Sequence, residues 1–160
     1  MLEWLETTAY ADWVRESWGW PIALTVHAFG VATVIGLMAI IGLRLLGAFK
    51  TIAFTALNKL IPLLWIALIL QVVSGGTLWM TKPGKYVADP MFDSKMALVV
   101  IGALITWYFH VTVNREAPVW EKEGTVSSRG VRFVAATALL WAAVTIAGRL
   151  TAYISQLYIA

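Results

Sequence analysis

The chain has 160 residues, of which 60% are hydrophobic and 13% are charged, and its mean hydropathy is +0.77. This composition lies outside the usual range of soluble domains and predicts a protein that resides in a lipid bilayer. The net charge is +3, and the basic residues form no continuous stripe, so the charge does not indicate a nucleic-acid partner. The absence of cysteine excludes disulfides, thiolate metal sites, iron–sulfur clusters and covalently attached c-type haem.

Residues 1–20 predict a short amphipathic helix that lies on the outer membrane surface ahead of the first span. Its apolar side chains recur at helical spacing: Leu2, Leu5, Ala9 and Trp13. The segment is acidic and rich in tryptophan, unlike a cleavable signal peptide, so the mature chain is expected to begin at Met1. Docking of the same segment on a partner protein is the alternative.

Four apolar stretches follow, each long enough to cross a hydrocarbon core of about 30 Å, which takes about 20 helical residues. They comprise residues 21–49, 57–80, 92–113 and 131–158. Only short connections remain between them. Residues 21–160 are therefore predicted to form one domain, an all-α integral membrane four-helix bundle.

Lysine and arginine gather in and beside the first and third connections, which predicts that these connections face the cytoplasm. The positions are Arg44, Lys50, Lys59, Arg115, Lys122, Arg129 and Arg132. Most acidic residues lie instead in the N-terminal segment and the second connection. Both termini are therefore expected outside, in the periplasm if the host has two membranes, and the chain is expected to be a multi-pass protein of a bacterial inner membrane.

Three protonatable side chains are expected in the outer half of this bundle. His27 lies six residues into the first span, about 9 Å below its start. Lys95 lies five residues beyond Pro90, where the third helix is expected to begin, or about 8 Å along the axis. Arg149 lies nine residues before the end of the fourth span, about 13 Å from it. An ionisable group inside a bilayer is a candidate functional residue.

A b-type haem would account for these residues together. His27 would supply the axial nitrogen to the iron, and Arg149 would bind a propionate through its planar guanidinium group. Lys95 would be a second iron ligand if neutral or a propionate partner if charged. Gly30, one turn from His27, would leave space for the flat ring. No catalytic residue is assigned.

Each of these residues also has a simpler interpretation. His27 would then donate a hydrogen bond to a carbonyl of a neighbouring helix. Lys95 would extend outward to the interface, because helical side chains tilt toward the N-terminus. Arg149 lies too deep for that and would bind either a ligand carboxylate or an acidic residue of the N-terminal segment.

The second histidine, His110, lies 15 residues beyond Lys95, or about 22 Å along the helix. It directly follows the aromatic residues 107–109 and is predicted to lie in an aromatic belt at the cytoplasmic interface. Gln71 and Ser74, midway along the second span, are predicted to make hydrogen bonds between helices, with a role in a proton path as the alternative.

The third span, from Lys95-Met-Ala-Leu-Val-Val to Trp107-Tyr108-Phe109-His110, resembles the Lys-x-x-Leu-Val…Tyr-x-His helix of HemJ-type protoporphyrinogen oxidases and of the related CopD-like membrane proteins. In HemJ-like proteins a first-helix histidine and this third-helix lysine are tied to haem, which implies such a role for His27 and Lys95. The acidic, tryptophan-rich N-terminal segment departs from that pattern, so the resemblance implies the cofactor site and not the oxidase reaction.

Two further stretches resemble an uncharacterised family of small bacterial four-helix membrane proteins. One lies in the first span, from Val26-His27 to Gly42-Leu43-Arg44-Leu45-Leu46-Gly47. The other is Gly148-Arg149-Leu150-Thr151-Ala152-Tyr153, at the end of the fourth span.

Three classes of function fit these features. The first is a haem-b-binding redox protein that passes electrons between a membrane carrier and a periplasmic partner. The second is a noncatalytic structural or assembly subunit of a larger membrane complex, with the tryptophan-rich N-terminal segment as the contact surface. The third is a CopD-like copper or proton conduit, which the lack of cysteine and the few methionines disfavour. Association of the chain with itself is compatible with each class.

Overall fold

The computed structural model describes the backbone of residues 3–87 and 90–157, and the side chains of residues 4–87, 92–148 and 150. The described residues form helices and no strands: α1 Glu3–Glu6, α2 Ala9–Glu16, α3 Gly19–Leu45, η1 Phe54–Lys59, α4 Ile61–Met80, α5 Pro83–Val87, α6 Pro90–Glu123 and α7 Ser128–Leu157. Within this part of the chain, four helices are long and apolar enough to cross a membrane. The predicted all-α fold, with four helices long and apolar enough to span a membrane, is confirmed for the described residues.

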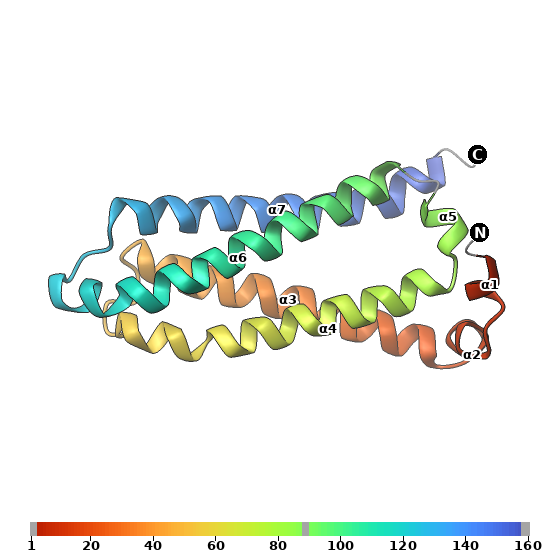
Figure 1. Cartoon of the computed structure of the whole chain (residues 1–160), viewed down its shortest axis with the longest axis horizontal. Helices are drawn as coiled ribbons and strands as arrows, with labels where there is room; N and C mark the ends of the chain where they lie inside the picture. Colours follow the sequence, from red (N-terminus) through yellow and green to blue (C-terminus); the bar gives the residue numbers. More distant parts are fainter. Residues whose placement is uncertain (1–2, 88–89, 158–160) are drawn as a thin grey trace.

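The long helices α3, α4, α6 and α7 run lengthwise through the molecule, and the N-terminus, α1, α2 and α5 lie at one end (Figure 1). We call this end the α2 end and the opposite one the η1 end. The basic residues that flank the first and third connections belong to the η1 end, because they lie near the C-terminal ends of α3 and α6 and the N-terminal end of α7. Which end faces the cytoplasm stays a prediction.

The third span continues as a helix ten residues beyond its expected end at Val113 and ends before Gly124, which has a positive φ of 67°. Pro118 lies inside this extension without ending it. Near its end Trp120 is only 1% exposed and packs edge-on against Phe54 of η1, with ring centroids 6.2 Å apart. The extension is therefore part of the core, although its hydropathy is low.

The buried apolar cluster lies toward the η1 end. It includes Leu37, Ile41, Leu64, Val113 and Trp120. There α3 packs on α4, α6 packs on α7, and η1 packs on α6. Toward the α2 end, α4 and α6 diverge (Figure 1), so the two helix pairs separate where the apolar cluster ends.

The N-terminal segment packs against its own bundle. Ala11 and Val14 of α2 are fully buried, and α2 contacts α3 and α4. The buried residues of α2 are not those of the expected apolar face. Trp13 is 53% exposed and Ala9 is exposed, while Leu2 lies outside the described residues. The contacts of α2 with α3 and α4 determine which face of α2 is buried. A helical wheel does not contain these contacts.

Hydrogen bonds fasten this segment across the α2 end. Arg15 Nη1 donates to the carbonyl oxygen of Thr81 at 3.0 Å, and Glu6 Oε1 accepts from the backbone N–H of Gly84 at 3.2 Å. Both bonds join the N-terminal segment to the connection between α4 and α6. The α2 end is thus closed by polar contacts together with the packing of α2 on α3 and α4, whereas the larger apolar cluster closes the η1 end.

Candidate functional site

His27 lies on α3 with one edge of its imidazole ring against α4. Its Nδ1 is 3.0 Å from Ser74 Oγ, and the Ser74 hydroxyl donates to the carbonyl oxygen of Leu70 at 2.6 Å. A Cβ atom added at Gly75 would lie 3.2 Å from Cε1 of His27. The ring therefore fits against α4 because the residues there are serine and glycine.

Gln71, one turn before Gly75 on α4, contacts the same ring. With its amide nitrogen toward α3, Gln71 donates to His27 Nδ1 at 2.8 Å and to the His27 carbonyl oxygen at 3.1 Å, and its amide oxygen accepts from Val31 N at 3.0 Å. With nitrogen and oxygen exchanged, the oxygen would face only acceptors and the nitrogen only donors. The hydrogen-bond network therefore assigns the first orientation.

This network determines which ring nitrogen of His27 carries the proton. Nδ1 accepts from the amide of Gln71, so in the neutral imidazole the proton is on Nε2. Nε2 makes no hydrogen bond to the described residues, and the contacts of the ring with α4 are made by Nδ1 and Cε1. Among the described residues, Nε2 is therefore the ring nitrogen without a hydrogen-bond partner.

Lys95 of α6 lies close to the same region. Its side chain is partly buried and extends across α7, with Cε 3.6 Å and Nζ 3.9 Å from the position that a Cβ of Gly148 would occupy. The structure thus places His27 and Lys95 in the same half of the bundle, on two different helix pairs, near the N-terminal ends of α3 and α6.

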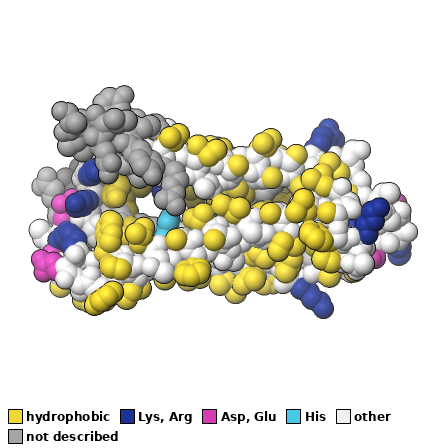
Figure 2. All heavy atoms as spheres, turned by 180° about the vertical axis from the view of Figure 1, so that it is seen from behind, with side chains coloured by type: hydrophobic (Ala, Val, Ile, Leu, Met, Phe, Trp, Pro, Cys, Tyr) yellow, Lys and Arg dark blue, Asp and Glu magenta, His cyan; other side chains and the backbone are white. Residues whose placement is uncertain are grey.

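Near the α2 end a histidine side chain is visible on the surface beside a small gap (Figure 2). Arg149 directly follows Gly148 on α7, but its side chain lies outside the described residues. Two of the three predicted site residues are therefore placed, and the position of the Arg149 guanidinium stays a prediction.

Gly30 does not border open space. A Cβ at this position would lie 3.1 Å from Cγ of Gln71 and 3.4 Å from the carbonyl oxygen of Ala67, and Gly30 is buried. The expected role of Gly30, space for a flat ring, does not match this arrangement, because that space holds Gln71. The glycine instead permits α4 to approach α3.

His110 belongs to a different part of the bundle. Its Nδ1 accepts from Trp65 Nε1 at 3.2 Å, and the two ring centroids are 6.3 Å apart. The 15 residues between Lys95 and His110 form one continuous helix, which separates them by about 22 Å along the axis. The two histidines therefore occupy separate sites.

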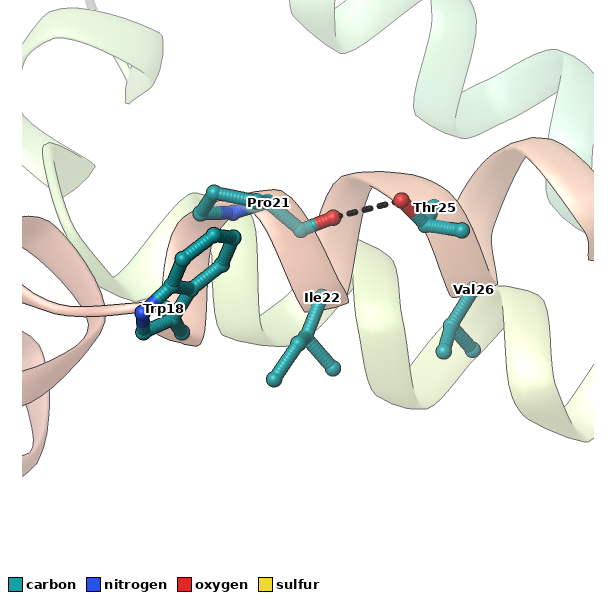
Figure 3. A pocket seen from close by; sticks show the side chains of 5 residues that line it. All are labelled: Trp18, Pro21, Ile22, Thr25 and Val26. Atoms are coloured by element: carbon teal, nitrogen blue, oxygen red, sulfur yellow. Dashed lines mark hydrogen bonds between the residues drawn. The ribbon is translucent and has the colours of Figure 1, made fainter.

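Two shallow apolar grooves mark the surface at the α2 end. One, of about 270 Å³, follows α3 from Trp18 to Val26 (Figure 3). Its Thr25 hydroxyl donates to the carbonyl oxygen of Pro21 at 2.7 Å (Figure 3) and so offers no free donor. The other, of about 210 Å³, lies between α2, α3 and α4 and reaches Ser74. Neither groove is lined by His27.

Among the described residues, no group of three or more histidine, cysteine, aspartate or glutamate side chains could hold a metal ion. Comparison with protein-family models, with curated proteins and with solved structures found no match. The function must therefore be argued from the His27 site itself.

Proposed function

We propose that this chain is a haem-b-binding membrane redox protein that passes electrons between a membrane carrier and a periplasmic partner, with His27 as the axial ligand. The observation that carries the proposal is the placement of His27, whose Nδ1–Cε1 edge is held against α4 while Nε2 has no hydrogen-bond partner among the described residues. Metal-ligating histidines usually donate the N–H of their other ring nitrogen to a neighbouring acceptor, which orients the ring.

The residues around His27 fit such a group. An imidazole that ligates through Nε2 carries its proton on Nδ1. Ser74 Oγ, 3.0 Å from Nδ1, can accept a hydrogen bond from this Nδ1–H group. Lys95 would bind a propionate as a cation or ligate the iron as a neutral amine. Arg149 is expected to bind a propionate through its planar guanidinium. When bound, the haem supplies one-electron chemistry, while these residues orient and anchor it.

A second candidate function is a noncatalytic subunit of a larger membrane complex. Three tryptophan side chains at the α2 end are largely exposed: Trp4 at 63%, Trp13 at 53% and Trp18 at 78%. Tryptophan is enriched at the centres of protein interfaces. This surface would meet the partner protein.

The visible spectrum of the purified full-length protein, expressed with ample haem, tests the first proposal. We expect a Soret band that His27→Ala abolishes and that the matched variant His110→Ala retains. Arg149→Ala should weaken haem retention by about 1 to 3 kcal/mol, the scale of a charge-assisted hydrogen bond. Lys95→Met should shift the spectrum if Lys95 ligates the iron and leave it unchanged if Lys95 does not.

A colourless wild-type protein would overturn the redox proposal and favour the second candidate. Loss of the Soret band in His110→Ala, with the fold intact, would indicate that the haem binds in the other half of the bundle.

A further inference from the structure

The amide of Gln71 is the group that decides the tautomer of His27. The Ser74 hydroxyl already donates to Leu70 O at 2.6 Å, so toward His27 Nδ1 it is available as an acceptor. The amide can present either a donor or an acceptor to the same nitrogen. Only the donor orientation also satisfies the His27 carbonyl oxygen and Val31 N, at 3.1 and 3.0 Å. Without a guest, the network therefore favours a proton on Nε2.

That tautomer cannot ligate iron through Nε2, because Nε2 carries a hydrogen. Ligation requires the single ring proton to move from Nε2 to Nδ1, with no net uptake or release of protons. Nδ1 would then donate to Ser74 Oγ, and the Gln71 amide nitrogen would have to leave Nδ1. Binding a nitrogen-ligated guest thus breaks the contact at 2.8 Å between Gln71 and Nδ1.

We propose that Gln71 is a positioning residue that holds His27 in the Nε2–H tautomer, and that rotation of its amide accompanies ligation at Nε2. Gln71 therefore opposes ligand binding, whereas Ser74, which accepts from Nδ1–H, supports it. The two neighbours of one ring nitrogen have opposite effects. The tautomer assignment stands on the hydrogen bonds alone, while the link to ligation rests on the proposed function.

Nitrogen-15 NMR of the full-length protein, labelled at histidine and free of haem, tests the tautomer. The chain contains only two histidines, so in the His110→Ala background all histidine signals come from His27. We expect protonated Nε2 in the wild type and in Ser74→Ala, and protonated Nδ1 in Gln71→Leu. If Nδ1 of His27 is protonated in the protein with an unchanged site, the proposal is overturned. That result requires no substitution at His27, Gln71 or Ser74.

Titration with haemin tests the link to ligation. Gln71→Leu should bind haemin about 2- to 10-fold more tightly than the wild type, and Ser74→Ala should bind it more weakly by a similar factor, which corresponds to one neutral hydrogen bond. Gln71→Met serves as a second variant if Gln71→Leu does not fold. Weaker binding in both Gln71 variants would overturn the opposing role of Gln71.

The two proposals fail in different ways. If the expected tautomers are found but no variant binds haemin, the proposed function is wrong and the positioning role of Gln71 stands. If haemin binds through His27 but the tautomer is the same in wild type and Gln71→Leu, the positioning role is wrong and the proposed function stands.

Discussion

Adjacent glycines on α4 provide a direct test of how His27 fits against that helix. A Cβ at Gly75 would lie 3.2 Å from Cε1 and 3.6 Å from Nδ1 of His27, whereas a Cβ at Gly76 would have no described neighbour within 4 Å. Gly76→Ala is therefore a matched control for Gly75→Ala. Both substitutions lower the backbone entropy of the unfolded chain, which stabilises the folded protein by about 0.5 to 1 kcal/mol in each variant. Only Gly75→Ala displaces the imidazole ring.

The difference between the two variants estimates the cost of crowding the ring. Adding a methyl group to a filled contact costs about 1 to 3 kcal/mol. For a chain of this size, 1 kcal/mol corresponds to about 2 to 4 °C in Tm. We therefore expect Gly75→Ala to melt about 2 to 12 °C below Gly76→Ala, in the same detergent and without haem.

A double-mutant cycle assigns this difference to His27. In the His27→Ala background the ring is absent, so Gly75→Ala and Gly76→Ala should have equal Tm values. The assay is thermal unfolding followed by circular dichroism in all combinations of the three substitutions. A difference that persists in the His27→Ala background would refute the contact between Gly75 and the imidazole.

Three further outcomes are expected. Reporter fusions after Lys50 and Gly124 should report a cytoplasmic location and a fusion after Ala160 a periplasmic one, because basic connections remain inside; a cytoplasmic C-terminus would contradict this. His110→Ala should retain the NMR signature of His27, since the two rings lie in separate halves of the bundle; a changed His27 tautomer would show coupling. Burial raises the pKa of Tyr86, so the stability that this phenol contributes is complete below its ordinary pKa and is lost as pH rises through the raised value. The tyrosinate absorbance that Tyr86→Phe removes should titrate above that ordinary value.

The membrane spans could be predicted because hydropathy is a local property of the sequence. The helix ends could not, because they depend on packing. Trp120 keeps the third long helix in the core well beyond Val113. In α2 the buried residues are Ala11 and Val14, since α3 and α4 lie on that side.

The site was predictable in part for the same reason. Counting residues from the helix starts places His27 and Lys95 at similar depth, since the rise per residue is constant at about 1.5 Å. The contact of His27 with Gln71 and Ser74 depends on how α3 and α4 are rotated about their axes. Glycines at two positions permit this rotation, and no single-sequence pattern specifies that Gly30 faces Gln71 or that Gly75 faces His27.

The position of the site follows from where the bundle has its core. The buried apolar cluster begins on α3 at Val34, two turns beyond His27, so His27 lies between this cluster and the packing of α2 on α3 and α4. There hydrogen bonds of the His27 ring join α3 and α4, and Lys95 lies in the same half of the bundle, against Gly148 of α7. The larger apolar cluster lies toward the η1 end, so we expect the α2 end to open locally at a lower free-energy cost. If a guest binds beside Nε2 of His27, we expect movement at the α2 end, while the core at the η1 end preserves the fold.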